Sequence, residues 1–154
     1  MEWSSILVPV DLSPISEEVV RQAVALATGE QPVVILLHVI DTSLIEFAAS
    51  HQFGSREEIV ERMKQRAYAE LKRLQELGAG RVEVDILVCE GTPFVQIVQK
   101  AQDFLCDAIV MGKVGGRGLL EKLLFGSTAE KVLRASPCPV VVLPIRPADT
   151  SAET

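Results

Sequence analysis

Residues 6–14 read ILVPVDLSP. The run before Asp11 is apolar and rich in β-branched residues, which is typical of a buried strand. Ser13 followed by Pro14 has the order of a helix N-cap and a first helical residue. The stretch therefore predicts a strand that passes through a short turn directly into a helix.

The same order of a short apolar run and a longer segment of helical period repeats along the chain. Further strands are expected at residues 33–40, 82–88, 108–111 and 139–144, and further helices at 55–77, 93–104 and 127–135. The second strand is apolar at nearly every position, as expected of a parallel sheet covered on both faces. We therefore predict an α/β fold, a three-layer sandwich with a five-stranded parallel sheet of order 3-2-1-4-5. Residues 42–54 show no clear pattern.

Composition excludes several classes of protein. The chain has 154 residues, 48% of them hydrophobic, and a net charge of −6, which is the wrong sign for a general nucleic-acid binder. No apolar run approaches the roughly 18 residues of a membrane span, and the first residues lack the basic start of a signal peptide. The three cysteines are scattered without a CxxC pair, so we expect free thiols and no metal site. One cytoplasmic domain over residues 1–145 with a flexible tail at 146–154 is expected.

A glycine-rich segment follows the fourth predicted strand. In the predicted order this strand lies beside the first, where the winding reverses and ligands bind beyond the strand ends. Half of the ten glycines lie here, at Gly112, Gly115, Gly116, Gly118 and Gly126. Residues 113–125 carry three basic side chains against one acidic, so the segment, together with the start of the next helix, is a candidate anion site. Neither a P-loop nor a G-x-G-x-x-G fingerprint is present.

Three observations at this place have a purely structural alternative. The glycines are as consistent with tight turns as with a phosphate site. Ser127 and Glu130 have the spacing of a capping box. Asp11 is either a turn residue or a carboxylate that accepts hydrogen bonds from a ligand amine or ribose hydroxyl.

Several short motifs together resemble the universal stress protein family. They are Val8-Pro9-Val10-Asp11-Leu12-Ser13, Leu37-His38-Val39, Gly91-Thr92-Pro93, Ile109-Val110-Met111-Gly112, Gly126-Ser127-Thr128-Ala129-Glu130 and Ser136-Pro137-Cys138-Pro139-Val140. The resemblance covers residues 3–144. It implies a Rossmann-like fold of the adenine nucleotide alpha hydrolase type and, in many members, ATP binding.

The resemblance also implies a set of binding residues. Asp11 would contact adenine between Pro9 and Val39, while Gly126 and the residues after it would hold the phosphates. The full expected set is Pro9, Val10, Asp11, Ser13, Val39, Met111, Gly112, Lys113, Gly115, Gly116, Arg117, Gly126, Ser127 and Thr128. The glycine loop is one residue longer than the family motif, because either Gly115 or Gly116 serves as the second glycine. ATP is the expected ligand, with ADP or AMP as alternatives and magnesium carried by the phosphates.

The last strand indicates how the chain associates. Val140, Val141, Val142 and Leu143 would form an uncharged apolar edge strand, which a second copy covers in a homodimer. The C-terminal tail is the alternative cover. No activated nucleophile or ligand cluster points to an enzyme, and at most slow ATP hydrolysis is expected. The expected function is a stress or signalling module with an unidentified protein partner; the alternative is a nucleotide-free dimeric interaction protein.

Overall fold

The computed structural model describes residues 2–114 and 126–146. Five parallel strands form one sheet in the order β3-β2-β1-β4-β5. The strands are β1 (Ser5–Pro9), β2 (Val33–Asp41), β3 (Glu83–Gly91), β4 (Ala108–Val114) and β5 (Val140–Ile145). The predicted α/β class and strand order are confirmed.

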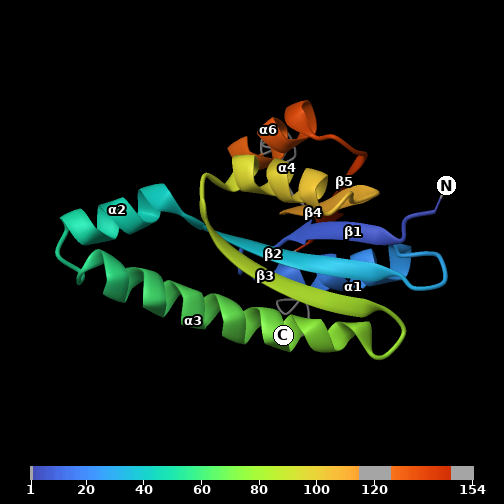
Figure 1. The fold of residues 1–154 in the computed structure, drawn as a ribbon, viewed down its shortest axis with the longest axis horizontal. Helices are drawn as coiled ribbons and strands as arrows, with labels where there is room; N and C mark the ends of the chain where they lie inside the picture. Colours follow the sequence, from blue (N-terminus) through green and yellow to red (C-terminus); the bar gives the residue numbers. More distant parts are fainter. Residues whose placement is uncertain (1, 115–125, 147–154) are drawn as a thin grey trace.

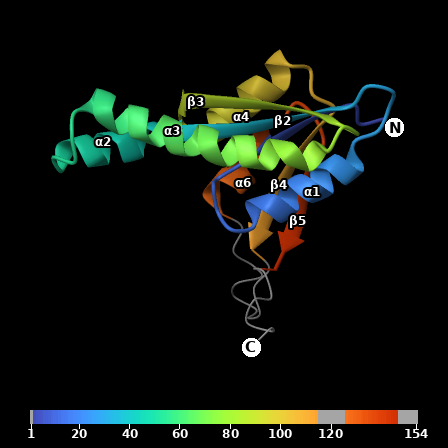
Figure 2. The ribbon, with the colours of Figure 1, turned by 90° about the horizontal axis from the view of Figure 1, so that it is seen from below.

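Helices cover both faces of the sheet (Figures 1 and 2). One face carries α1 (Ser16–Leu26) and α3 (Arg56–Gln75), which ends in the 3-10 turn η1 (Glu76–Gly78). The other face carries α4 (Pro93–Asp103) and α6 (Ser127–Ala135). A separate buried apolar cluster lies on each side of the sheet, so the fold has the three predicted layers.

The helix starts agree with the sequence in part. Ser55 and Glu58 form the predicted capping box of α3. α1 instead begins at Ser16 without a side-chain cap, so the prediction of Ser13 as N-cap is wrong. The predicted capping box at Ser127 is also wrong, because α6 already includes Ser127 and its N-cap is Gly126.

The unassigned segment forms α2 (Thr42–Ser50), which extends with the start of α3 beyond the end of the sheet (Figures 1 and 2). Its helical pattern is hidden because only Ile45 is buried, while Leu44 and Phe47 are exposed. Phe104, directly after α4, is exposed as well. The predicted tail at 146–154 lies, except for Arg146, outside the described residues, so the domain boundary at residue 145 stays a prediction.

β1 is shorter than both of its neighbours, and Pro9 explains why. Val10 donates its N–H to the carbonyl oxygen of Leu37 on β2 at 2.7 Å, and amides alternate between the two sides of a strand. The preceding position therefore faces β4, where proline has no N–H to donate. The β1–β4 pairing ends at Leu7 and Ile109, whereas β2 pairs with β3 as far as Asp41. Beyond β1 the β2–β3 and β4–β5 pairs diverge (Figure 2).

Gly112 lies inside β4 and not at the start of a loop, which corrects the prediction for this residue. A Cβ atom at Gly112 would lie 2.3 Å from Cγ2 of Val19 and 3.2 Å from Cδ1 of Ile15, both on the α1 side. The missing side chain therefore allows α1 to pack directly against β4.

We expect Gly112→Ala to lower the free energy of unfolding by about 1–3 kcal/mol, because the new methyl group overlaps Val19. Urea denaturation of the single variants and of Gly112→Ala/Val19→Ala measures the coupling between the two positions. If Gly112→Ala costs as much in the Val19→Ala background as in the native protein, the clash with Val19 is not the cause.

Candidate functional site

A pocket of about 880 Å³ opens where the two pairs of strands diverge. Its walls come from the carboxyl ends of β1, β2 and β4, the turn before α1, and the first residues of α4 and α6. The predicted binding residues in its lining are Pro9, Val10, Asp11, Ser13, Val39, Met111, Gly112, Lys113, Gly126, Ser127 and Thr128. The other three, Gly115, Gly116 and Arg117, lie outside the described residues. The structure thus brings together every predicted binding residue that it describes.

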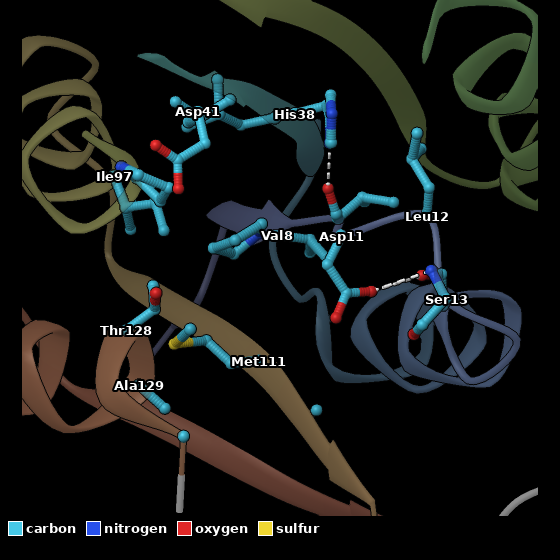
Figure 3. Close-up of a pocket in the computed structure, with 18 of the residues that line it drawn as sticks. Val8, Asp11, Leu12, Ser13, His38, Asp41, Ile97, Met111, Thr128 and Ala129 are labelled. Carbon is cyan, nitrogen blue, oxygen red and sulfur yellow. Dashed lines mark hydrogen bonds between the residues drawn. The ribbon is translucent and has the colours of Figure 1, made fainter. Parts of the chain in front are cut away.

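Asp11 uses one carboxylate oxygen to shape the turn after β1. Its Oδ1 accepts hydrogen bonds from the Ser13 N–H at 2.9 Å and from the Ser16 hydroxyl at 3.3 Å (Figure 3). Oδ2 has no hydrogen-bond partner among the described residues. Asp11 is therefore a turn residue that still offers an acceptor to a ligand, so the two readings of this residue are compatible.

Leu12, between Asp11 and Ser13, has a left-handed backbone with φ of +64°. This conformation costs a leucine roughly 1–2 kcal/mol, which the surrounding contacts must offset. The hydrogen bond from the Ser13 N–H to the Asp11 side chain closes the turn after Leu12. The Leu12 side chain packs against the apolar core under α1. The turn is thereby fixed in one shape before any ligand arrives.

His38 fastens the same turn to β2. Its Nδ1 lies 2.6 Å from the carbonyl oxygen of Val10 (Figure 3), so Nδ1 carries the proton and donates it to this acceptor. The other histidine, His51, is exposed and stacks on Phe47 with ring centroids 4.1 Å apart.

The start of α6 faces the pocket from the β4 side. Gly126 has φ of +60°, a conformation that favours glycine, and its carbonyl oxygen accepts the first helical bond, from the N–H of Glu130 at 3.2 Å. Ser127, Thr128 and Ala129 lie before Glu130 in this first turn, so their N–H groups have no acceptor within the helix. Together with the positive end of the helix dipole they suit an anion. Lys113 adds a positive charge to the same wall.

Several lining residues escaped sequence reasoning. Asp41 ends β2, Leu44 comes from α2, Met63 and Arg66 from α3, and Ile97 from α4. One signal for Asp41 was available: Asp41-Thr42-Ser43 repeats the pattern of an aspartate after a strand and a serine two residues later, as in Asp11-Leu12-Ser13.

The cysteine thiols lie outside the lining of the pocket. The three cysteines are free, and burial raises the pKa of the Cys89 and Cys106 thiols, which keeps them neutral. Within residues 2–114 and 126–146 no three His, Cys, Asp or Glu side chains come together as a metal centre. None of the helices in the described part of the chain is long and apolar enough to cross a membrane.

A doubly wound parallel sheet with a pocket at its switch point defines a class of α/β domains that bind ligands beyond the strand ends. Residues 2–144 match the model of the universal stress protein family, and the chain belongs to this family. It is 33% identical over 142 residues to universal stress protein MJ0531 of Methanocaldococcus jannaschii, covering 92% of this chain and 82% of that protein. The family resemblance seen in the sequence is thus confirmed.

Solved structures show the same fold. Protein MJ0577, also a universal stress protein of Methanocaldococcus jannaschii, superposes with a TM-score of 0.80 at 30% identity, covering 95% of this chain and 99% of that one. A universal stress protein from Archaeoglobus fulgidus in complex with dAMP gives a TM-score of 0.61 at 24% identity, covering 92% and 98%. A universal stress protein in complex with cAMP gives 0.65 at 21%, covering 96% and 100%.

We expect His38→Phe to lower the free energy of unfolding by about 1–3 kcal/mol, because it leaves the Val10 carbonyl oxygen without its donor in a partly buried place. His51→Phe is the matched control and should cost less than about 1 kcal/mol at its exposed position. Thermal denaturation of both variants tests this. Ring ¹⁵N NMR of the native protein should show the Nδ1–H tautomer at His38; the Nε2–H tautomer would contradict the assignment.

Proposed function

We propose that this chain is a cytoplasmic ATP-binding universal stress protein that acts as a stress-response or signalling module. The observation that carries the proposal is the polarity of the pocket. The first amides of α6 and the Lys113 side chain lie on the β4 side. Oδ2 of Asp11, which has no hydrogen-bond partner among the described residues, lies at the end of β1. A nucleotide has the matching polarity, with anionic phosphates at one end and hydrogen-bond donors on its base and ribose.

The phosphates would lie at the start of α6. There the N–H groups of Ser127 and Thr128 can donate hydrogen bonds to the phosphates, and the Lys113 side chain adds positive charge. Gly115, Gly116 and Arg117 belong to the intervening segment and would complete the phosphate site. We expect binding to tolerate the extra residue of that segment, and magnesium would be carried by the phosphates.

The nucleoside would lie toward β1 and β2. Pro9, Val39 and Met111 offer apolar surface to the base, and Val10 and Ser13 border it along the turn. Asp11 accepts a hydrogen bond from adenine or from a ribose hydroxyl. Relatives of the same fold in complexes with cAMP and dAMP support an adenine nucleotide as the ligand, which leaves ADP and AMP as alternatives to ATP.

Isothermal titration calorimetry with ATP, with and without magnesium, tests this proposal. We expect micromolar binding that Asp11→Ala weakens by about tenfold or more, because a ligand donor loses its charged acceptor. Gly126→Val should abolish it, because a β-branched residue cannot keep φ of +60° at the start of α6. The control is Gly80→Ala, a second glycine with positive φ that lies outside the pocket lining.

Folded protein that gives no heat with ATP, ADP or AMP would contradict the proposal. The function would then be that of a nucleotide-free dimeric interaction protein, the alternative that the exposed edge of β5 favours.

We also propose a homodimer joined through β5. Within the described residues this strand pairs with β4 on one side only, and Val140, Val141, Val142 and Leu143 are half-buried and uncharged. A second copy would cover the free edge across a two-fold axis.

We expect sedimentation equilibrium at micromolar concentration to give a dimer, and Val142→Lys to give a monomer, because a charge on the edge opposes strand pairing. Val95→Lys, at an exposed apolar position on α4, is the control and should stay dimeric. A monomeric native protein would contradict the edge assignment.

A further inference from the structure

Asp41 is a second carboxylate at the rim of the pocket, and neither the family motif nor the site described above uses it. Its Oδ1 accepts hydrogen bonds from the N–H and hydroxyl of Ser43, at 2.9 and 2.8 Å, and so caps α2. Oδ2 has no hydrogen-bond partner in the described part of the chain. The cap therefore fixes the carboxylate and leaves one strong acceptor facing the cavity that Asp41 lines.

The place of Asp41 relative to the proposed phosphate site is set by the sheet. β2 and β4 lie on opposite sides of β1, about 10 Å apart where both pair with it, and they diverge beyond it. The register pairs Pro9 with Leu37, which puts Asp11 level with Val39. Asp41 lies two residues further, about 6–7 Å beyond that level. It is thus on the β2 side of the pocket, across from α6, and its carboxylate points toward Ile97 and away from Ser13 (Figure 3).

A nucleotide with its phosphates at α6 directs its base toward this end of the pocket. Adenine carries an exocyclic amino donor at position 6, whereas guanine and hypoxanthine carry a carbonyl acceptor there. A carboxylate oxygen accepts from the amino group and repels the carbonyl oxygen. We propose that Asp41 is a specificity-determining residue that selects 6-amino purines through its free oxygen. This inference rests on the nucleotide site proposed above.

The variant Asp41→Asn tests the inference with little effect on the fold, because asparagine is as good an N-cap as aspartate. Its Oδ1 can keep the Ser43 bonds, which places the amide Nδ2 where it can donate to a 6-oxo group. We expect the native protein to bind ATP about tenfold or more tightly than inosine triphosphate or GTP. In Asp41→Asn this preference should fall to about threefold or less, by weaker ATP binding and tighter binding of the 6-oxo nucleotides.

Ser43→Ala is the matched control. It removes the hydroxyl bond to Oδ1 and weakens the α2 cap, but it leaves Oδ2 in place. Its ATP preference should equal that of the native protein. Thermal denaturation of all three proteins shows whether each variant is folded at the titration temperature.

The outcomes separate this inference from the proposed function. A native protein that binds none of the three nucleotides overturns the nucleotide site itself. Native protein that binds ATP and inosine triphosphate equally well, or an Asp41→Asn variant that keeps the full preference, overturns the role of Asp41 alone. An equal loss of preference in Ser43→Ala also overturns it, because Asp41 would then act only by positioning α2.

Discussion

The N–H that Pro9 lacks is the constraint on which the rest of the site depends. Without it β1 cannot continue its ladder with β4, while Val10 still bonds to β2. The sheet divides at this point into the β2–β3 and β4–β5 pairs, and the space between them becomes the pocket (Figure 2). A residue that could donate there would extend the ladder and narrow the opening. The missing N–H of Pro9 thus accounts for the opening of the pocket.

The floor of the pocket is rigid because several contacts fix the turn after β1. The Asp11 side chain bonds to the Ser13 N–H, and the His38 ring bonds to the Val10 carbonyl oxygen. These contacts hold Leu12 in its left-handed conformation. Local strain kept in place by surrounding bonds is common at functional sites, where it orients groups before a ligand binds. Here the oriented group is the second oxygen of Asp11.

Most of the fold could be predicted from the sequence because it depends on apolar periodicity. Other features depend on contacts that no local pattern reveals. Gly112 belongs to a glycine-rich stretch and suggests a loop, yet it lies in β4 because α1 packs against it through Val19. α2 was missed because its apolar residues are mostly exposed, which removes the buried stripe that marks a helix. The prediction of Ser13 as a helix N-cap was wrong. Its carbonyl oxygen accepts a hydrogen bond from the Ser16 N–H, but its hydroxyl caps no helix amide. The pocket-lining residues that belong to the sequence motifs were predicted, while Asp41, which the length of β2 places at the rim, was not.

The two ends of the pocket belong to strand pairs that no ladder joins beyond Pro9. The amides of α6 and Lys113 follow or belong to β4, whereas Asp41 ends β2 and begins α2. A ligand that reaches both ends forms the cross-link that the sheet lacks there, so its binding energy adds to the stability of the divided edge. Asp41 also caps α2 through Oδ1. In the proposed complex this one carboxylate would therefore contact the ligand through Oδ2 and the first turn of α2 through Oδ1.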